Sequence, residues 1–176
     1  WIAGTADSLN CLRKTSCSRW SRLIVPVFRR TSGSLNSPNS FSETENPARN
    51  LVATARITQA DRMMIFLPFY HIYGAMLMGA AAYAGATAVL MERFEPAECL
   101  RLIEEHRITL FFVVPPVLVM LSAWPELKKY DLSSIRFTMV GAAPLAPEVT
   151  RRFRELTGVT VVQGYGLTEA APLPHL

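Results

Sequence analysis

Three short segments of this 176-residue chain bring together glycine, aromatic and hydrogen-bonding residues that could bind a ligand. The first segment, residues 67–74, places one imidazole and two phenols directly after an apolar run. The second segment, residues 141–144, has side chains so small that a flat ligand could lie against its backbone. In the third segment, residues 163–169, two glycines flank Tyr165, and such residues allow the backbone to approach a ligand closely.

The third segment ends with a hydroxyl followed by a carboxylate, Thr168 and Glu169. This pair suits a phosphate contact beside a ligand for a hard cation such as Mg²⁺. Each segment also has a simpler explanation: a core aromatic cluster around a hydrogen-bonded His71, an ordinary strand-to-helix turn, and a glycine-rich turn whose threonine caps a helix. The order and spacing of all three together are more specific than any one of them.

Apolar runs and helical spacing alternate along the chain from residue 50 onward. Expected strands cover residues 63–67, 87–91, 109–114, 134–140 and 159–163, and expected helices cover 70–83 and 96–106 and begin at Pro115 and Pro147. Strands separated by helices predict an α/β fold, with a mostly parallel sheet and flanking helices. Because ligands bind at the carboxyl ends of parallel strands, we expect the three segments to meet there.

Two long apolar stretches also allow a membrane hairpin as an alternative. Residues 63–91 and 108–125 contain no Asp, Glu, Lys or Arg, and both approach the length of a membrane-spanning helix. Pro68 interrupts the first stretch, and Pro115 and Pro116 lie in the middle of the second. Strands and helices of a parallel sheet buried on both faces show the same apolarity, so we expect no transmembrane segment.

The formal net charge of +4 comes entirely from residues 1–50, which hold seven basic and three acidic residues. Residues 51–176 carry eleven of each sign, so the main body offers no field that would attract nucleic acid. The three cysteines (Cys11, Cys17 and Cys99) are too few and too scattered for a disulfide framework or a zinc site. We therefore expect a reducing compartment, the cytoplasm, with a peroxisome or another organelle as the alternative.

Taken together, the three segments resemble those of the AMP-forming acyl- and aryl-CoA ligases, the group that includes 4-coumarate–CoA ligase and firefly luciferase. The resemblance covers about residues 49–176, and the string at 163–169 is its most specific part. It implies part of the large N-terminal domain of an adenylate-forming enzyme. The implied reaction joins a small carboxylic acid to ATP, which gives an acyl-adenylate and pyrophosphate, and coenzyme A then displaces AMP to form a thioester.

The resemblance also assigns roles in binding the nucleotide. It implies that Thr168 and Glu169 are the catalytic residues: Thr168 contacts a nucleotide phosphate and Glu169 holds Mg²⁺. The implied nucleotide-binding residues are Ala143, Gln163, Gly164, Tyr165 and Thr168.

The same resemblance assigns a pocket for the carboxylic acid. The implied substrate-binding residues are His71, Tyr73, Gly141, Ala142 and Ala143. Arg93 falls where relatives often carry a basic residue near the phosphates of coenzyme A, and an ordinary surface charge is the alternative for it.

Composition and the same resemblance divide the chain into a disordered leader, residues 1–47, and a partial AMP-binding domain, residues 48–176. Residues 31–47 are mostly polar and predict a loop or disorder. We expect an unstructured or wrongly joined leader, and a transit peptide is the alternative because the leader is rich in arginine and serine. Relatives carry a phosphate-binding loop with a lysine in this region. Here residues 31–34 are only weakly similar to that loop, and Asn39 stands where the lysine is expected.

The chain stops shortly after the third segment, before the ribose-binding acid and the small C-terminal domain that the resemblance implies. We therefore expect a truncated chain that is inactive by itself. A non-catalytic remnant of the family, which keeps the sheet but has lost the pocket, is the second alternative.

Overall fold

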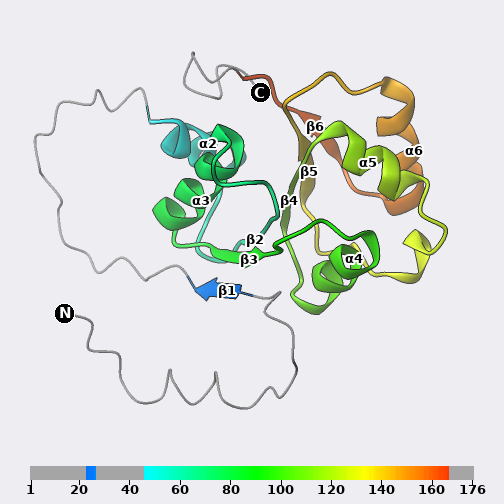
Figure 1. Ribbon diagram of the computed structural model, residues 1–176, viewed down its shortest axis with the longest axis horizontal. Coiled ribbons are helices and arrows are strands. Elements are labelled where there is room, and N and C mark those ends of the chain that lie inside the picture. Colours follow the sequence, from blue (N-terminus) through cyan, green and yellow to red (C-terminus); the bar gives the residue numbers. More distant parts are fainter. Residues whose placement is uncertain (1–22, 27–45, 167–176) are drawn as a thin grey trace, which may run out of the picture.

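In the computed structural model, which describes residues 23–26 and 46–166, one sheet of six strands lies between two layers of helices (Figure 1). The strand order is β1-β3-β2-β4-β5-β6, and every neighbouring pair is parallel except β1 and β3. The strands are β1 Leu23–Pro26, β2 Arg62–Ile65, β3 Thr87–Leu90, β4 Leu110–Val113, β5 Phe137–Val140 and β6 Val161–Gln163. The predicted α/β fold with a mostly parallel sheet is confirmed.

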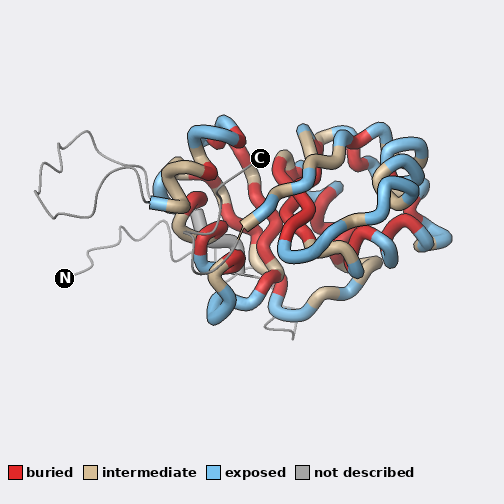
Figure 2. Tube along the Cα trace, turned by 90° about the horizontal axis from the view of Figure 1, so that it is seen from above, coloured by how far each residue is buried: buried red, intermediate tan, exposed pale blue. Residues whose placement is uncertain are grey.

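The helices divide between the two faces of the sheet (Figure 1). Helices α2 and α3 cover one face, and α4, α5 and α6 cover the other. Their bounds are α2 Pro47–Ala55, α3 Ile72–Ala84, α4 Pro96–Glu105, α5 Pro115–Ser122 and α6 Pro147–Thr157, with a short 3₁₀ helix, η3, at Leu127–Lys129. Figure 2 shows the buried strands between the more exposed outer helices.

Alternation along the strands explains why both faces of the sheet are apolar. In β2, Met63 and Ile65 pack against α2 and α3, whereas Met64 packs against α4 and α5. All four residues of β4 are buried because this strand lies in the middle of the sheet. The first long apolar stretch therefore holds β2, α3 and β3, and the second holds β4 and α5. Among the described residues no helix is long and apolar enough to cross a membrane.

Proline and glycine mark the helix ends that the sequence predicts. Helices α4, α5 and α6 begin with proline, which suits the first turn, where its missing N–H is not needed. Helix α3 ends at Gly85, which adopts the left-handed conformation (φ 69°). The structure starts this helix at Ile72, because the side chain of His71 caps it there, two residues later than predicted.

Helix α2 was not predicted, and it replaces the end of the predicted loop. The loop expected to reach residue 47 ends instead at Asn46, whose Oδ1 accepts hydrogen bonds from the backbone of Ala48 (3.1 Å) and Arg49 (3.3 Å). Pro47 then opens the helix. Only Leu51 and Ala55 are buried, so the apolar period was too short to be recognised. Strand β1 lies within the predicted leader, and the rest of residues 1–45 lies outside the described part of the chain.

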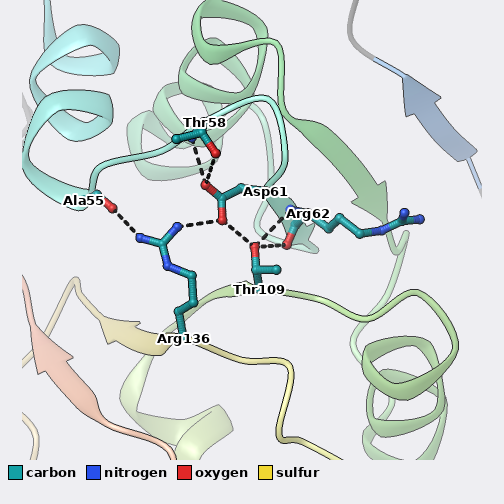
Figure 3. Close-up of polar contacts among 6 residues, drawn as sticks. All are labelled: Ala55, Thr58, Asp61, Arg62, Thr109 and Arg136. Atoms are coloured by element: carbon teal, nitrogen blue, oxygen red, sulfur yellow. Dashed lines mark hydrogen bonds and ion pairs between the residues drawn. The ribbon is translucent and has the colours of Figure 1, made fainter.

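A buried carboxylate ties the amino ends of the central strands together (Figure 3). Asp61, which is 3% exposed, accepts hydrogen bonds from Thr58, Thr109 and Arg136. Arg136 also donates to the carbonyl of Ala55 at the end of α2 (3.2 Å). Burial raises the pKa of Asp61, but the bonds from Thr109, Thr58 and Arg136 together outweigh it and hold that pKa below the ordinary value.

The lowered pKa of Asp61 predicts a specific sensitivity to acid. A carboxyl group whose pKa is lower in the folded state stabilises the fold above its unfolded pKa, and that contribution disappears as the pH falls through the folded value. Urea unfolding of the native sequence should therefore lose stability below about pH 4. In Asp61→Asn the free energy of unfolding at pH 7 should fall by about 3 kcal/mol, and the acid-dependent loss should shrink. An unchanged pH dependence in this variant would contradict the assignment.

Candidate functional site

The three segments of the sequence analysis follow three strands of the sheet. Residues 67–74 follow β2, residues 141–144 follow β5, and residues 163–166 begin with the last residue of β6. Because these strands are parallel, all three segments lie at the same edge, the carboxyl edge. Strand β4 lies between β2 and β5, and β5 is next to β6. The described parts of the three segments therefore share one rim.

The first segment forms a tight turn that enters α3. The backbone N–H of His71 donates to the carbonyl of Pro68 (3.1 Å), and its ring Nδ1 accepts from the backbone N–H of Tyr73 (3.1 Å). In a neutral ring this leaves the proton on Nε2, so an exposed donor remains on the rim. Gly74 packs so closely on this turn that a Cβ there would lie 2.8 Å from the Leu67 carbonyl oxygen and closer still to that of Pro68.

Tyr73 joins the first segment to the second across β4. Its side chain is buried, and its hydroxyl donates to the carbonyl of Met139 in β5 (3.4 Å). Its ring lies against Gly141, where an added Cβ would be 3.2 Å from Cε1 of the tyrosine. Burial raises the pKa of the phenol well above its ordinary value, so the hydroxyl stays a neutral donor. The two segments are therefore in direct contact.

The second segment presents backbone rather than side chains. Gly141 is buried and its N–H donates to the carbonyl of Val113 in β4 (3.1 Å), whereas Ala142 and Ala143 are exposed. Ala142 has a φ of 71°, which is uncommon for a residue with a Cβ. Strained backbone of this kind is often found at functional sites, where the surrounding structure holds a turn in a shape that an unconstrained chain would not keep.

The strain at Ala142 gives a prediction about stability. Ala142→Gly should raise the free energy of unfolding by about 1 kcal/mol, because glycine adopts positive φ without steric cost. Ala143→Gly is the matched control: its φ is not positive, so the same change should lower stability by about 0.5 kcal/mol. Thermal or urea unfolding of both variants measures the difference, and equal effects of the two changes would contradict the prediction.

The third segment is attached through the backbone to the end of β5, directly before the second segment. The N–H of Gly164 donates to the carbonyl of Val140 (2.9 Å), and the side chains of Gln163 and Tyr165 are exposed, Tyr165 by 59%. An aromatic ring exposed to this extent beside two glycines leaves a flat surface open at the rim. Thr168 and Glu169 lie outside the described residues, so their predicted roles stay predictions.

Arg93 lies farther away along the same edge. It is exposed in the turn after β3, and two strands, β2 and β4, separate β3 from β5. The ring of the neighbouring Phe94 packs on Phe66 (5.0 Å between centroids), which fixes this turn beside the end of β2. The structure therefore places Arg93 at the same edge as the other predicted residues, beside the end of β2 and two strands away from β5.

The described residues contain no cluster of three or more His, Cys, Asp or Glu side chains that could hold a metal ion. The predicted magnesium ligand, Glu169, lies outside them. At the carboxyl edge the described part of the chain exposes backbone, the imidazole of His71 and the ring of Tyr165.

Comparison with known proteins identifies the family. A model of the AMP-binding enzyme family matches residues 42–175 of the chain. The chain belongs to the AMP-binding enzymes. Among curated relatives of this family, a long-chain-fatty-acid–CoA ligase of Bacillus subtilis (strain 168) is 33% identical over 161 residues, and a probable 4-coumarate–CoA ligase 1 of Dictyostelium discoideum is 40% identical over 157. These alignments cover 86% and 85% of this chain and 28% of each relative.

Solved AMP-binding enzymes share the fold. The N-terminal domain of FACL13 from Mycobacterium tuberculosis matches with a TM-score of 0.68 and 27% identity, over 73% of this chain and 33% of that chain. ATP-bound MatB from Rhodopseudomonas palustris matches with a TM-score of 0.65 and 29% identity, over 73% of this chain and 26% of that one. The fold prediction, part of an N-terminal domain of an adenylate-forming enzyme, is confirmed. The chain spans under a third of the curated relatives described above.

Two structural features of this AMP-binding enzyme were not predicted from its sequence, one at the rim and one at the opposite edge of the sheet. Gly74 was counted only as part of the first segment, although its close contact with the backbone of Leu67 and Pro68 fixes the turn that carries His71. The bonds around Asp61 at the opposite edge were missed entirely. A lone acidic residue before one strand and a lone arginine before another were the available signals, but nothing in the sequence pairs them.

Proposed function

We propose that this chain is part of an AMP-forming acid–CoA ligase, which activates a small carboxylic acid as an acyl-adenylate and transfers the acyl group to coenzyme A. The observation that carries the proposal is the contact between Tyr73 and Gly141, together with the bond from Gly164 to Val140. These contacts support one shared site for the three segments that carry the family resemblance. The family match and the ligase names of the relatives support the reaction class.

The second and third segments would bind the nucleoside. Ala142 and Ala143 are exposed and have side chains too small to shield their backbone, so a flat adenine ring could lie on them. The exposed ring of Tyr165 could cover the other face of that base, with Gln163 and Gly164 at its border. The ATP in the MatB structure, a solved structure with the same fold, supports a nucleotide as the ligand.

The first segment would bind the acid. The Nε2–H of His71 is the exposed donor there, and it could hold a carboxylate oxygen next to the α-phosphate. Tyr73, whose hydroxyl is directed to Met139, would form the wall behind Gly141 rather than a second donor to the acid. Holding the carboxylate oxygen and the α-phosphorus that it attacks in place lowers the entropic part of the barrier, since the attack then resembles a step within one molecule.

Three assignments rest on the family resemblance alone. Thr168 would contact a phosphate, Glu169 would hold Mg²⁺, and Arg93 would meet the phosphates of coenzyme A. A bound Mg²⁺ would neutralise phosphate charge, and its proposed ligand, Glu169, lies outside the described residues. The proposed domain division, a leader at 1–47 and a partial AMP-binding domain at 48–176, has the same basis.

We also propose that this chain does not complete the reaction alone. It spans 28% of the length of each of the two ligases compared above, and the proposed transfer to coenzyme A would need residues from the rest of such a protein, including a C-terminal domain. The cytoplasm is the proposed compartment, because Cys99 is a free, buried thiol and the three cysteines do not suggest a disulfide framework.

Calorimetric titration with a non-hydrolysable acyl-sulfamoyl-adenosine tests the proposal, since binding does not require turnover. We expect saturable binding that weakens about tenfold or more in Gly141→Val, which fills the surface beside Tyr73. Arg152→Ala on the exposed side of α6 is the matched control and should bind as the native sequence does. Absence of binding by a folded native chain, judged by circular dichroism, would favour the non-catalytic remnant.

A further inference from the structure

The junction between β2 and β4 is the shortest ladder between parallel strands of the described sheet. It has two register pairs, Met63 with Leu110 and Met64 with Phe111, whereas β2–β3 and β4–β5 have four each and β5–β6 has three. This junction divides the candidate site, because the first segment follows β2, and the second and third segments follow β5 and β6. The relative position of the two halves therefore depends on what holds β2 to β4 and β5.

Side chains complete this ladder at the amino edge. The N–H of Thr109 donates to the carbonyl of Arg62 (2.9 Å), but the N–H of Arg62 donates to the side-chain oxygen of Thr109 (3.0 Å) rather than to a backbone carbonyl. The Thr109 hydroxyl in turn donates to Oδ1 of Asp61 (2.7 Å), and Arg136 donates to the same oxygen (2.7 Å) (Figure 3). Residues at the starts of β2, β4 and β5 thus share one buried carboxylate oxygen.

At the carboxyl edge the same strands are joined by Tyr73. It enters from the helix that follows β2 and reaches Met139 and Gly141, in and after β5, although β4 lies between β2 and β5 in the sheet. The short ladder is therefore bridged at both ends, by a polar cluster at one and by an aromatic ring at the other. Strands of four residues are only about 13 Å long, so a shift of register at one end reaches the other end undiminished.

We propose that Asp61 and Arg136 are positioning residues for the candidate site: together with Thr109 they fix β2 against β4 and β5, and so set the distance between the first segment and the other two. The expected effect on ligand affinity rests on the proposed function, whereas the role of the cluster in holding β2 against β4 and β5 does not. Asp61 is 3% exposed and all its hydrogen bonds go to residues of the sheet edge and the preceding turn, far from the rim. The pair therefore acts through the sheet and not by contact with a ligand.

The test compares two kinds of variant of the full 176-residue chain. Asp61→Asn and Arg136→Gln weaken the polar cluster, whereas Leu102→Ala shortens a buried apolar side chain of α4 and leaves the hydrogen bonds of that cluster in place. For each variant, urea unfolding gives the stability, calorimetry gives the affinity for the acyl-sulfamoyl-adenosine, and hydrogen exchange follows the amides of β2 and β4. All titrations are made where the variants remain folded.

We expect Asp61→Asn and Arg136→Gln each to weaken the affinity of the folded chain for the probe about tenfold. The double variant should bind no more weakly than the single variant with the larger effect, since both residues act on one cluster. In these variants, hydrogen exchange should rise more at residues 62–67 and 108–113 than at the amides of α4. Leu102→Ala should change affinity by less than about twofold even at a larger loss of stability. Affinity that simply follows stability in all variants, or exchange that rises equally everywhere, would overturn the inference.

Variants of Thr109 provide a second test, which can be used even if an Asp61 variant does not fold. Thr109→Ser keeps the hydroxyl that accepts from Arg62 and donates to Asp61, whereas Thr109→Val keeps the shape and removes it. Only the valine variant should speed exchange in β2 and β4, and equal exchange in the two variants would contradict the inference. If the native chain does not bind the probe, the proposed function fails for this chain, but the exchange comparison still decides the role of the cluster.

Discussion

Gly74→Ala is expected to lower the free energy of unfolding by about 3 kcal/mol or more and to displace the turn that carries His71. The added Cβ would meet backbone atoms of Leu67 and Pro68, and it would lie 2.8 Å from the Leu67 carbonyl oxygen. Backbone cannot move aside as a flexible side chain can, so the contact is relieved only if α3 or the turn shifts. Urea unfolding measures the loss, and hydrogen exchange over residues 67–74 measures the displacement.

Gly79→Ala on the same helix is the matched control. Its Cβ would meet only the Cβ of Ala48, at 3.3 Å, and alanine favours the helix by about 1 kcal/mol over glycine. We therefore expect its stability to stay within about 1 kcal/mol of the native value. If Gly74→Ala and Gly79→Ala had the same small effect, the close packing of α3 on the first turn would be wrong.

Tyr73→Ala is expected to cost about 3–5 kcal/mol, because it removes a buried ring that fills the space between α3 and Gly141. Tyr73→Phe keeps the ring and removes only the hydroxyl that donates to Met139, so it should cost about 1 kcal/mol. The difference between these two variants separates the packing of the ring from its hydrogen bond. Chemical unfolding monitored by circular dichroism provides both values.

Tyr165→Ala serves as the comparison for that pair. This ring is 59% exposed, so its loss should change stability by less than about 0.5 kcal/mol while it weakens binding of the proposed nucleoside. A large loss of stability in Tyr165→Ala, or a small one in Tyr73→Ala, would mean that the assignment of one ring to the core and the other to the rim is reversed.

Much of the fold could be predicted because its signals are local. The apolar run that holds β2 and the proline and glycine at the helix ends depend on neighbouring residues, so the sequence displays them directly. Helix α2 was missed because its signals are weak: only Leu51 and Ala55 are buried, and the capping Asn46 ends a polar stretch that resembles a loop.

The polar cluster at the amino edge could not be predicted because its partners are distant in sequence. Asp61 is separated by 48 residues from Thr109 and by 75 from Arg136, and only the strand order β2-β4-β5 brings them together. The rim was easier to predict, since any residue that directly follows a parallel strand lies there. What the sequence could not show is how Tyr73 is used: the structure buries its ring against Gly141 and directs its hydroxyl to Met139.

Hydrogen exchange with and without a saturating acyl-sulfamoyl-adenosine is the sharpest test of a shared site, because it reports where the ligand lies. We expect protection to rise together in residues 67–74, 141–144 and 163–166, and the amino-edge residues around Asp61 to change little. Protection confined to one of the three segments, or centred on the amino edge, would contradict a shared site at the carboxyl edge of the sheet.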